Sequence, residues 1–128
     1  NAQKVAEFLE AHEQVAWVNF AGLPSHPDHA MAQKYMGGKA SAIMSFGVKG
    51  GEAAAVKFID ALQLLYRLVN IGDAKSLACH PATTTHRQLN ADEMEKVGVS
   101  KDLIRLSIGI EHIDDILADI TQALAAAK

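Results

Sequence analysis

The chain is short of cysteine, of positive charge and of long hydrophobic runs, and each shortage excludes a class of protein. Cys79 is the single cysteine among 128 residues, so no internal disulfide can form and a reducing compartment, the cytoplasm, is expected. A net charge of −3 without a basic cluster argues against a nucleic-acid partner. No apolar run approaches the length of a membrane span, so we expect no membrane partner.

The chain also lacks an initiating methionine. It opens NAQKVAEFLEAH, and helical periodicity begins almost at once, without a lead-in or a clear capping signal. We therefore expect the sequence to be a piece of a longer polypeptide that starts within or just before a helix. Its length and its hydrophobic content of 49% are enough for one domain with its own core.

Helical and strand patterns alternate from one end to the other. Strands are expected at 15–20, 42–49, 76–80 and 103–110. Helices are expected in the opening segment, at about 27–36, at about 52–68, after Asn90 with Glu93 in a capping box, and over the closing segment. The alternation predicts an α/β fold, a two-layer domain of about four strands with helices packed on the sheet.

Four histidines and the cysteine are the residues that a metal site would use. They are His26, His29, His80, His86 and Cys79. Nothing among them has the spacing of a zinc motif, and one cysteine supplies no thiolate pair. We therefore predict no metal site, histidines that hydrogen-bond locally, and a buried, inert thiol.

An arginine inside an apolar run, DLIRLSIGIE, is the main functional signal. In a strand, Ile104, Leu106, Ile108 and Ile110 would form an apolar face, and the side chain of Arg105 would project from the opposite face. It would then face either solvent or an anion. The polar turn NIGDAKSL at 70–77 offers Asn70 as a neutral donor beside the charged one. Together these two residues could bind one carboxylate, although the spacing also allows an ordinary turn.

In four stretches the chain resembles the C-terminal domain of the Cys/Met-metabolism family of pyridoxal-phosphate-dependent enzymes. They are WVNFAGLPSHPDH, SFGVKGG, VNIGDAKSLACHPATTTH and GVSKDLIRLSIGIEHIDDILADITQAL. No single stretch would be decisive, but together they cover nearly the whole chain in the right order. The resemblance implies that residues 1–128 form the C-terminal, substrate-side domain of a fold-type I transferase.

The resemblance also implies roles for two residues. Arg105, in the RLSIGIE segment, would bind the α-carboxylate of the substrate, and Asn70 would line the substrate pocket. Asn followed by GDAKSL is typical of the sulfhydrylase branch of the family, whereas the lyase branch usually has Ser at that position. Thr83 is a mild departure, because the family usually has HPAS where this chain has HPAT.

The cofactor implied is pyridoxal 5'-phosphate, bound by a large domain that this sequence does not include. No lysine lies in the family's Schiff-base motif, so we assign no catalytic, cofactor-binding or metal-binding residue and expect this chain alone to be inactive. The full-length protein is expected to convert O-acetylhomoserine and sulfide to homocysteine and acetate, in methionine and cysteine biosynthesis. It would do so as a homodimer or homotetramer in the cytoplasm.

Two alternatives remain open. Within the family, the chain could belong to a cystathionine γ-synthase or to a γ-lyase such as a methionine γ-lyase, although Asn70 and the residues after it favour the sulfhydrylase. Outside it, the chain could be a free-standing, non-catalytic α/β domain, against which the missing start argues.

Overall fold

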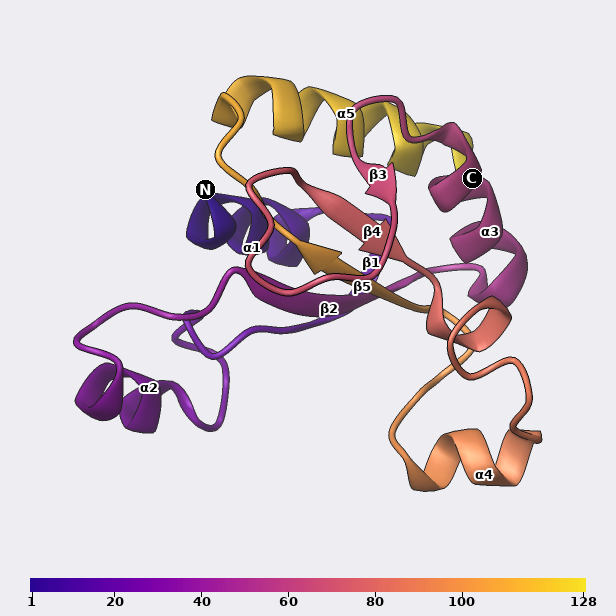
Figure 1. The fold of residues 1–128 in the computed structure, drawn as a ribbon, viewed down its shortest axis with the longest axis horizontal. Coiled ribbons are helices and arrows are strands. Elements are labelled where there is room, and N and C mark those ends of the chain that lie inside the picture. Colours follow the sequence, from indigo (N-terminus) through magenta and orange to yellow (C-terminus); the bar gives the residue numbers. More distant parts are fainter.

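The structure is a computed structural model that describes residues 1–128, apart from the side chains at positions 91 and 95. Helices and strands alternate along the chain (Figure 1). In order they are α1 (Ala2–Ala11), β1 (Val15–Asn19), α2 (His29–Tyr35), β2 (Ile43–Val48), α3 (Gly51–Ala61), β3 (Tyr66–Arg67), β4 (Leu77–Cys79), the 3₁₀ helix η1 (Pro81–Thr83), α4 (Ala91–Lys96), β5 (Leu103–Ser107) and α5 (Ile113–Ala126).

The strands form one sheet in the order β1-β2-β5-β4-β3, so the last strand in the sequence lies at the centre. Every neighbouring pair is antiparallel except β3 and β4, which are parallel. The four strands expected from the sequence are all present, and β3 is a short fifth strand at the edge that was not predicted. The predicted α/β class is confirmed.

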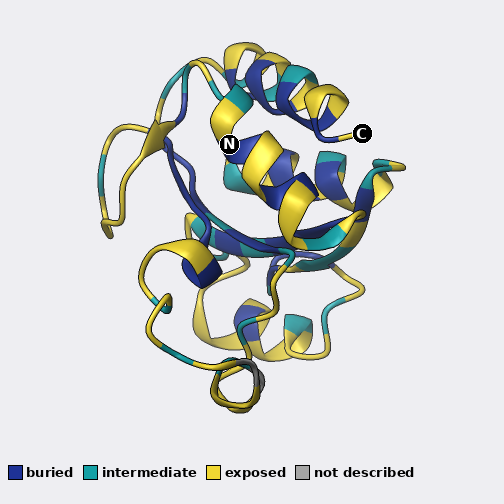
Figure 2. Cartoon of the chain, turned by 90° about the vertical axis from the view of Figure 1, so that its right-hand side faces the viewer, coloured by how far each residue is buried: buried dark blue, intermediate teal, exposed yellow. Residues whose placement is uncertain are grey.

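Three helices pack on one face of the sheet. Figure 2 shows α1, α3 and α5 together above it, whereas the segments that carry α2, η1 and α4 lie beyond the opposite face. The core between sheet and helices includes Phe46 of β2 and Phe58 of α3, whose rings meet edge to face at 5.5 Å. The layer of α1, α3 and α5 therefore covers only one of the two faces of the sheet.

The long helix predicted over 52–68 is wrong in its second half, because α3 ends at Ala61. A carboxylate from α5 explains the early end. Asp119 is buried and accepts hydrogen bonds from three consecutive backbone N–H groups, at 2.8, 2.8 and 3.0 Å, those of Gln63, Leu64 and Leu65. These contacts hold the chain in a turn, from which it enters β3.

The last strand is also shorter than predicted. Its core side chains Ile104 and Leu106 are fully buried, and Ile108 just beyond them is buried too. Ile110, predicted on the same face, is instead 83% exposed. The reason is that β5 ends at Ser107, so the alternation of a strand no longer applies at Ile110.

The predicted capping box at the start of α4 is confirmed. Glu93 donates its backbone N–H to the Asn90 side chain at 3.0 Å, and Asn90 donates its own to the Glu93 carboxylate at 2.9 Å. No helix that the structure describes is both long and apolar enough to cross a membrane.

Candidate functional site

Arg105 leaves the central strand on the sheet face that α1, α3 and α5 do not cover. Its sequence neighbours Ile104 and Leu106 are fully buried on the helical side, and Arg105 itself is half-buried on the other. The sequence prediction of which face the guanidinium takes is thereby confirmed. We call this side of the sheet, which α1, α3 and α5 do not cover, the open face. Because β5 is the central strand, Arg105 lies in the middle of the open face.

A row of polar side chains crosses the open face at the level of Arg105. Ser45 of β2 pairs with Arg105, Asn19 of β1 pairs with Ser45, and Cys79 of β4 pairs with Arg105 from the other side. Residues paired in this way across strands share one face of a sheet. We call these four residues the polar row. The sequence does not reveal that Asn19 and Ser45 lie in this row, because the strand register that aligns them is not visible in it.

A cavity of about 450 Å³ lies over part of this row, and we call it the Arg105 cavity. Its lining includes Asn19, Ser45 and Arg105 from the strands and two histidines from the flanking segments, His26 and His86. The His26 ring is 2.8 Å from the Asn19 side-chain oxygen. The cavity therefore combines one permanent positive charge with neutral groups that can donate or accept hydrogen bonds.

Arg105 contacts the turn at Asn70 through the backbone of Asn70 and not through its side chain. The Arg105 guanidinium donates to the Asn70 carbonyl oxygen at 3.3 Å. The Asn70 side chain turns the other way and donates to the Asp73 carboxylate at 3.1 Å, while its oxygen accepts the Ile71 N–H at 2.9 Å. The Lys75 backbone N–H, and after it the Asn70 amide, lower the pKa of Asp73.

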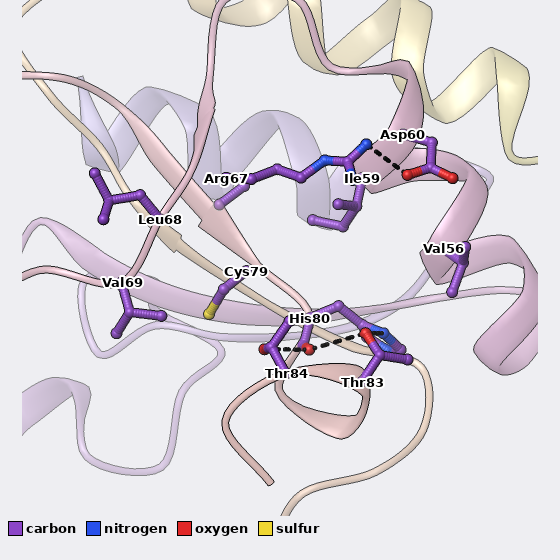
Figure 3. Close-up of a pocket in the computed structure, with 11 residues that line it drawn as sticks. Val56, Ile59, Asp60, Arg67, Leu68, Val69, Cys79, His80, Thr83 and Thr84 are labelled. Carbon is purple, nitrogen blue, oxygen red and sulfur yellow. Dashed lines mark hydrogen bonds and ion pairs between the residues drawn. The ribbon is translucent and has the colours of Figure 1, made fainter. Parts of the chain in front are cut away.

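A second cavity, of about 490 Å³, lies between α3, β3 and β4 (Figure 3). Cys79 and His80 line it. Burial raises the pKa of the Cys79 thiol, and the neighbouring Arg105 opposes that shift. The His80 ring is held between Thr83 Oγ1 at 2.9 Å and the Lys101 carbonyl at 2.7 Å. The thiol is buried, as predicted, whereas His80, predicted to be a turn or surface histidine with local hydrogen bonds, is buried and also contacts the distant Lys101.

The described residues do not fit pyridoxal phosphate. A lysine that forms a Schiff base needs a desolvated pocket, but every lysine of this chain is exposed, and none lines either of the two cavities above. Among the side chains that the structure describes, no group of three or more His, Cys, Asp or Glu is placed to hold a metal ion. What the chain does present is a guanidinium suited to a carboxylate.

The solved structures similar to this chain include pyridoxal-phosphate-dependent enzymes, and the chain shares their fold, which is fold type I. The chain belongs to the Cys/Met metabolism PLP-dependent enzyme family, whose model matches residues 1–125.

Among its relatives is O-acetyl-L-homoserine sulfhydrylase 1 of Thermus thermophilus, 50% identical over 98% of this chain and 30% of that protein. A candidate O-acetylhomoserine (thiol)-lyase from Campylobacter jejuni, solved with N'-pyridoxyl-lysine-5'-monophosphate, has a TM-score of 0.89 and 42% identity over 97% of this chain and 30% of that one. Cystathionine gamma synthase from Xanthomonas oryzae, in complex with cystathionine, has a TM-score of 0.86 and 40% identity, covering 98% and 32%. The chain thus spans about 30% of the length of the sulfhydrylase that it matches.

Proposed function

We propose that residues 1–128 are the C-terminal, substrate-side domain of an O-acetylhomoserine sulfhydrylase. In this proposal pyridoxal phosphate is bound by a large domain outside this sequence. The identity to a sulfhydrylase over nearly the whole chain and the family's cofactor support the proposal. The observation that carries it is the placement of Arg105 on the open sheet face, beside the turn at Asn70.

Arg105 would bind the α-carboxylate of O-acetylhomoserine. A planar guanidinium forms two parallel hydrogen bonds with a carboxylate, so it fixes the orientation of the substrate as well as its charge. Its contact to the Asn70 carbonyl holds the guanidinium beside the turn before the substrate arrives. The cofactor supplies the electron sink for the replacement of acetate by sulfide, and this domain supplies orientation.

Asn70 would shape the wall of the pocket next to the carboxylate. In the present structure its amide is engaged with Asp73, so its backbone rather than its side chain faces Arg105. We propose that the carbonyl oxygen of Asn70 orients the guanidinium and that the side chain maintains the turn.

The test is the Arg105→Ala variant of the full-length enzyme. We expect KM for O-acetylhomoserine to rise about 10- to 100-fold, since a charge-assisted hydrogen bond contributes about 1.5–3 kcal/mol. Arg105→Lys should recover only part of the loss, because an ammonium lacks the fork geometry. Arg87→Ala, which removes an exposed arginine, is the matched control and should leave KM unchanged. An unaltered KM for Arg105→Ala would reject the assignment.

Cystathionine γ-synthase is the second candidate, favoured by the similarity to the Xanthomonas oryzae enzyme. The two activities differ in the nucleophile, which is sulfide for the sulfhydrylase and cysteine for the synthase. Assaying the full-length enzyme with each nucleophile at equal concentration separates them. We expect sulfide to be used at least tenfold faster.

We also propose that the full-length protein acts in the cytoplasm as a homodimer or homotetramer on small amino-acid substrates. The family and the similarity to an O-acetyl-L-homoserine sulfhydrylase support the class of substrate. Light scattering of the purified full-length protein gives the subunit number directly, and a monomer would contradict it.

A further inference from the structure

A carboxylate outside the Arg105 cavity is bound to the far end of the turn that begins at Asn70. Glu111 follows β5 and accepts two hydrogen bonds from Ser76, one from the backbone N–H at 2.7 Å and one from the hydroxyl at 2.8 Å. The same hydroxyl accepts the Gly109 N–H at 2.9 Å. Ser76 is fully buried, whereas the Glu111 carboxylate is only partly buried.

The backbone of the turn at 70–76 also contacts the backbone of the residues that follow β5. Ile110 donates its N–H to the Ala74 carbonyl oxygen at 2.9 Å. At Gly109 the approach is so close that a Cβ atom would clash with the Ala74 carbonyl oxygen and with the Glu111 carboxylate. Glycine is therefore needed at this position for the two segments to pack against each other.

The turn from Asn70 to Ser76 is thus attached to the β5 segment at both ends. At one end Arg105 donates to the Asn70 carbonyl, and at the other Glu111 accepts from Ser76. Between these points the Asp73 carboxylate accepts from the Asn70 amide and from the Lys75 N–H at 3.0 Å. The attachment at Glu111 has more hydrogen bonds and is less exposed than the single one at Arg105.

We propose that Glu111 is a positioning residue for the carboxylate site, acting through Ser76 to set the turn at Asn70 relative to Arg105. The inference depends on the proposed function, since it concerns the same substrate carboxylate. A carboxylate that binds the guanidinium would share its five N–H donors with the single 3.3 Å contact to Asn70. The turn is then held in place by Glu111 and Ser76, which keep the pocket wall at its distance from the bound substrate.

The test uses the full-length holoenzyme and the Glu111→Gln variant. An amide keeps one acceptor oxygen for the Ser76 backbone N–H but presents a donor to the Ser76 hydroxyl, so that hydroxyl no longer donates to residue 111. We expect KM for O-acetylhomoserine to rise about tenfold with kcat changed less than about twofold, the pattern of lost ground-state positioning. Asp102→Asn is the matched control: its carboxylate flanks the other end of β5 and accepts from the Trp17 indole at 2.9 Å.

Combining Glu111→Gln with Arg105→Lys makes the test specific. If Glu111 acts through the geometry at Arg105, its effect on KM shrinks when the guanidinium is already gone, and the two effects are not additive. Independent effects on KM, or a lower melting temperature with KM unchanged, would overturn the proposal. If Arg105→Lys and Arg105→Ala leave KM unchanged, the proposed function itself fails, which is a distinct result.

Discussion

Arg105 and Cys79 face each other across β5 and β4, yet their environments give them different chemistry. The arginine is half-buried at the rim of a cavity and keeps its charge, because a guanidinium is not deprotonated in proteins. The thiol is only 7% exposed. Burial raises its pKa, so the reactive thiolate is disfavoured there.

We therefore expect Cys79 to react slowly with a thiol reagent in the folded protein. The rate of labelling at neutral pH should increase more than about tenfold in denaturing urea, since unfolding removes the burial that raises the pKa of the thiol. Mass spectrometry of the peptide that contains Cys79 follows its labelling in the full-length protein. Equal rates in the folded and unfolded states would contradict the buried assignment.

Glu111 gives a dependence of stability on pH. Burial acts to raise the pKa of its carboxyl, but the hydrogen bonds donated by backbone N–H groups and by the Ser76 hydroxyl outweigh it, and the pKa lies below the ordinary value of 4.5. A lowered pKa means that the carboxylate stabilises the folded state above the unfolded-state pKa. That contribution is lost as the pH falls through the folded-state pKa.

The corresponding measurement compares melting temperatures of the full-length protein and its Glu111→Gln variant from pH 7 downwards. The difference between the two should be largest near pH 7 and should shrink as the pH falls below 4.5. A difference that is constant over this range would show that the charge of Glu111 does not contribute to stability.

At the scale of elements, the turn between α3 and β3 depends on one side chain from α5. Replacing Asp119 by Ala leaves three backbone N–H groups without their acceptor, so we expect a loss of about 3 kcal/mol in the free energy of unfolding. Asp115→Ala on the same helix is the control: its side chain is exposed, and the expected loss is below about 1 kcal/mol. Urea unfolding measures both, and equal losses would contradict the role of Asp119.

Local patterns in the sequence were enough to predict most elements but not the contacts between them. The four strands and the capping box at Asn90 follow from alternation and spacing of residue types within a few positions. The chain leaves α3 at contacts with Asp119, which lies more than fifty residues away in the sequence, whereas the local periodicity runs on to Val69 and predicts a helix to Leu68. Long-range contacts of this kind cannot be inferred from periodicity.

In the candidate site, too, the local features could be predicted from the sequence and the long-range contacts could not. The face taken by Arg105 could be predicted because it depends only on strand alternation. The placement of Ser45 beside Arg105, and of Asn19 beside Ser45, depends on the register between strands, which the sequence does not specify. Ser76 and Glu111 lie in the NIGDAKSL and RLSIGIE segments, but nothing in either segment indicates that the two side chains are in contact.

For the molecule as a whole, the arrangement predicts how residues 1–128 behave on their own. Because every lysine is exposed, we expect residues 1–128 mixed with pyridoxal phosphate to show neither the absorbance band of a lysine-bound cofactor nor turnover of O-acetylhomoserine. Absorbance spectroscopy at equimolar cofactor tests the first part, with the full-length protein as the positive control. A distinct band from the isolated chain would contradict the assignment of cofactor binding to another domain.

The alternation along β5 has a consequence for how such enzymes diversify. Leu103 and Arg105 line the cavity, whereas Ile104 and Leu106 between them fill the core. Inherited changes at the first pair can alter the chemistry that a ligand meets while the packing against the helices is preserved. Changes at the second pair act mainly on whether the polypeptide accumulates in the cell. A saturation library over this strand, selected in parallel for growth and for protein abundance, should therefore separate into two interleaved sets of positions.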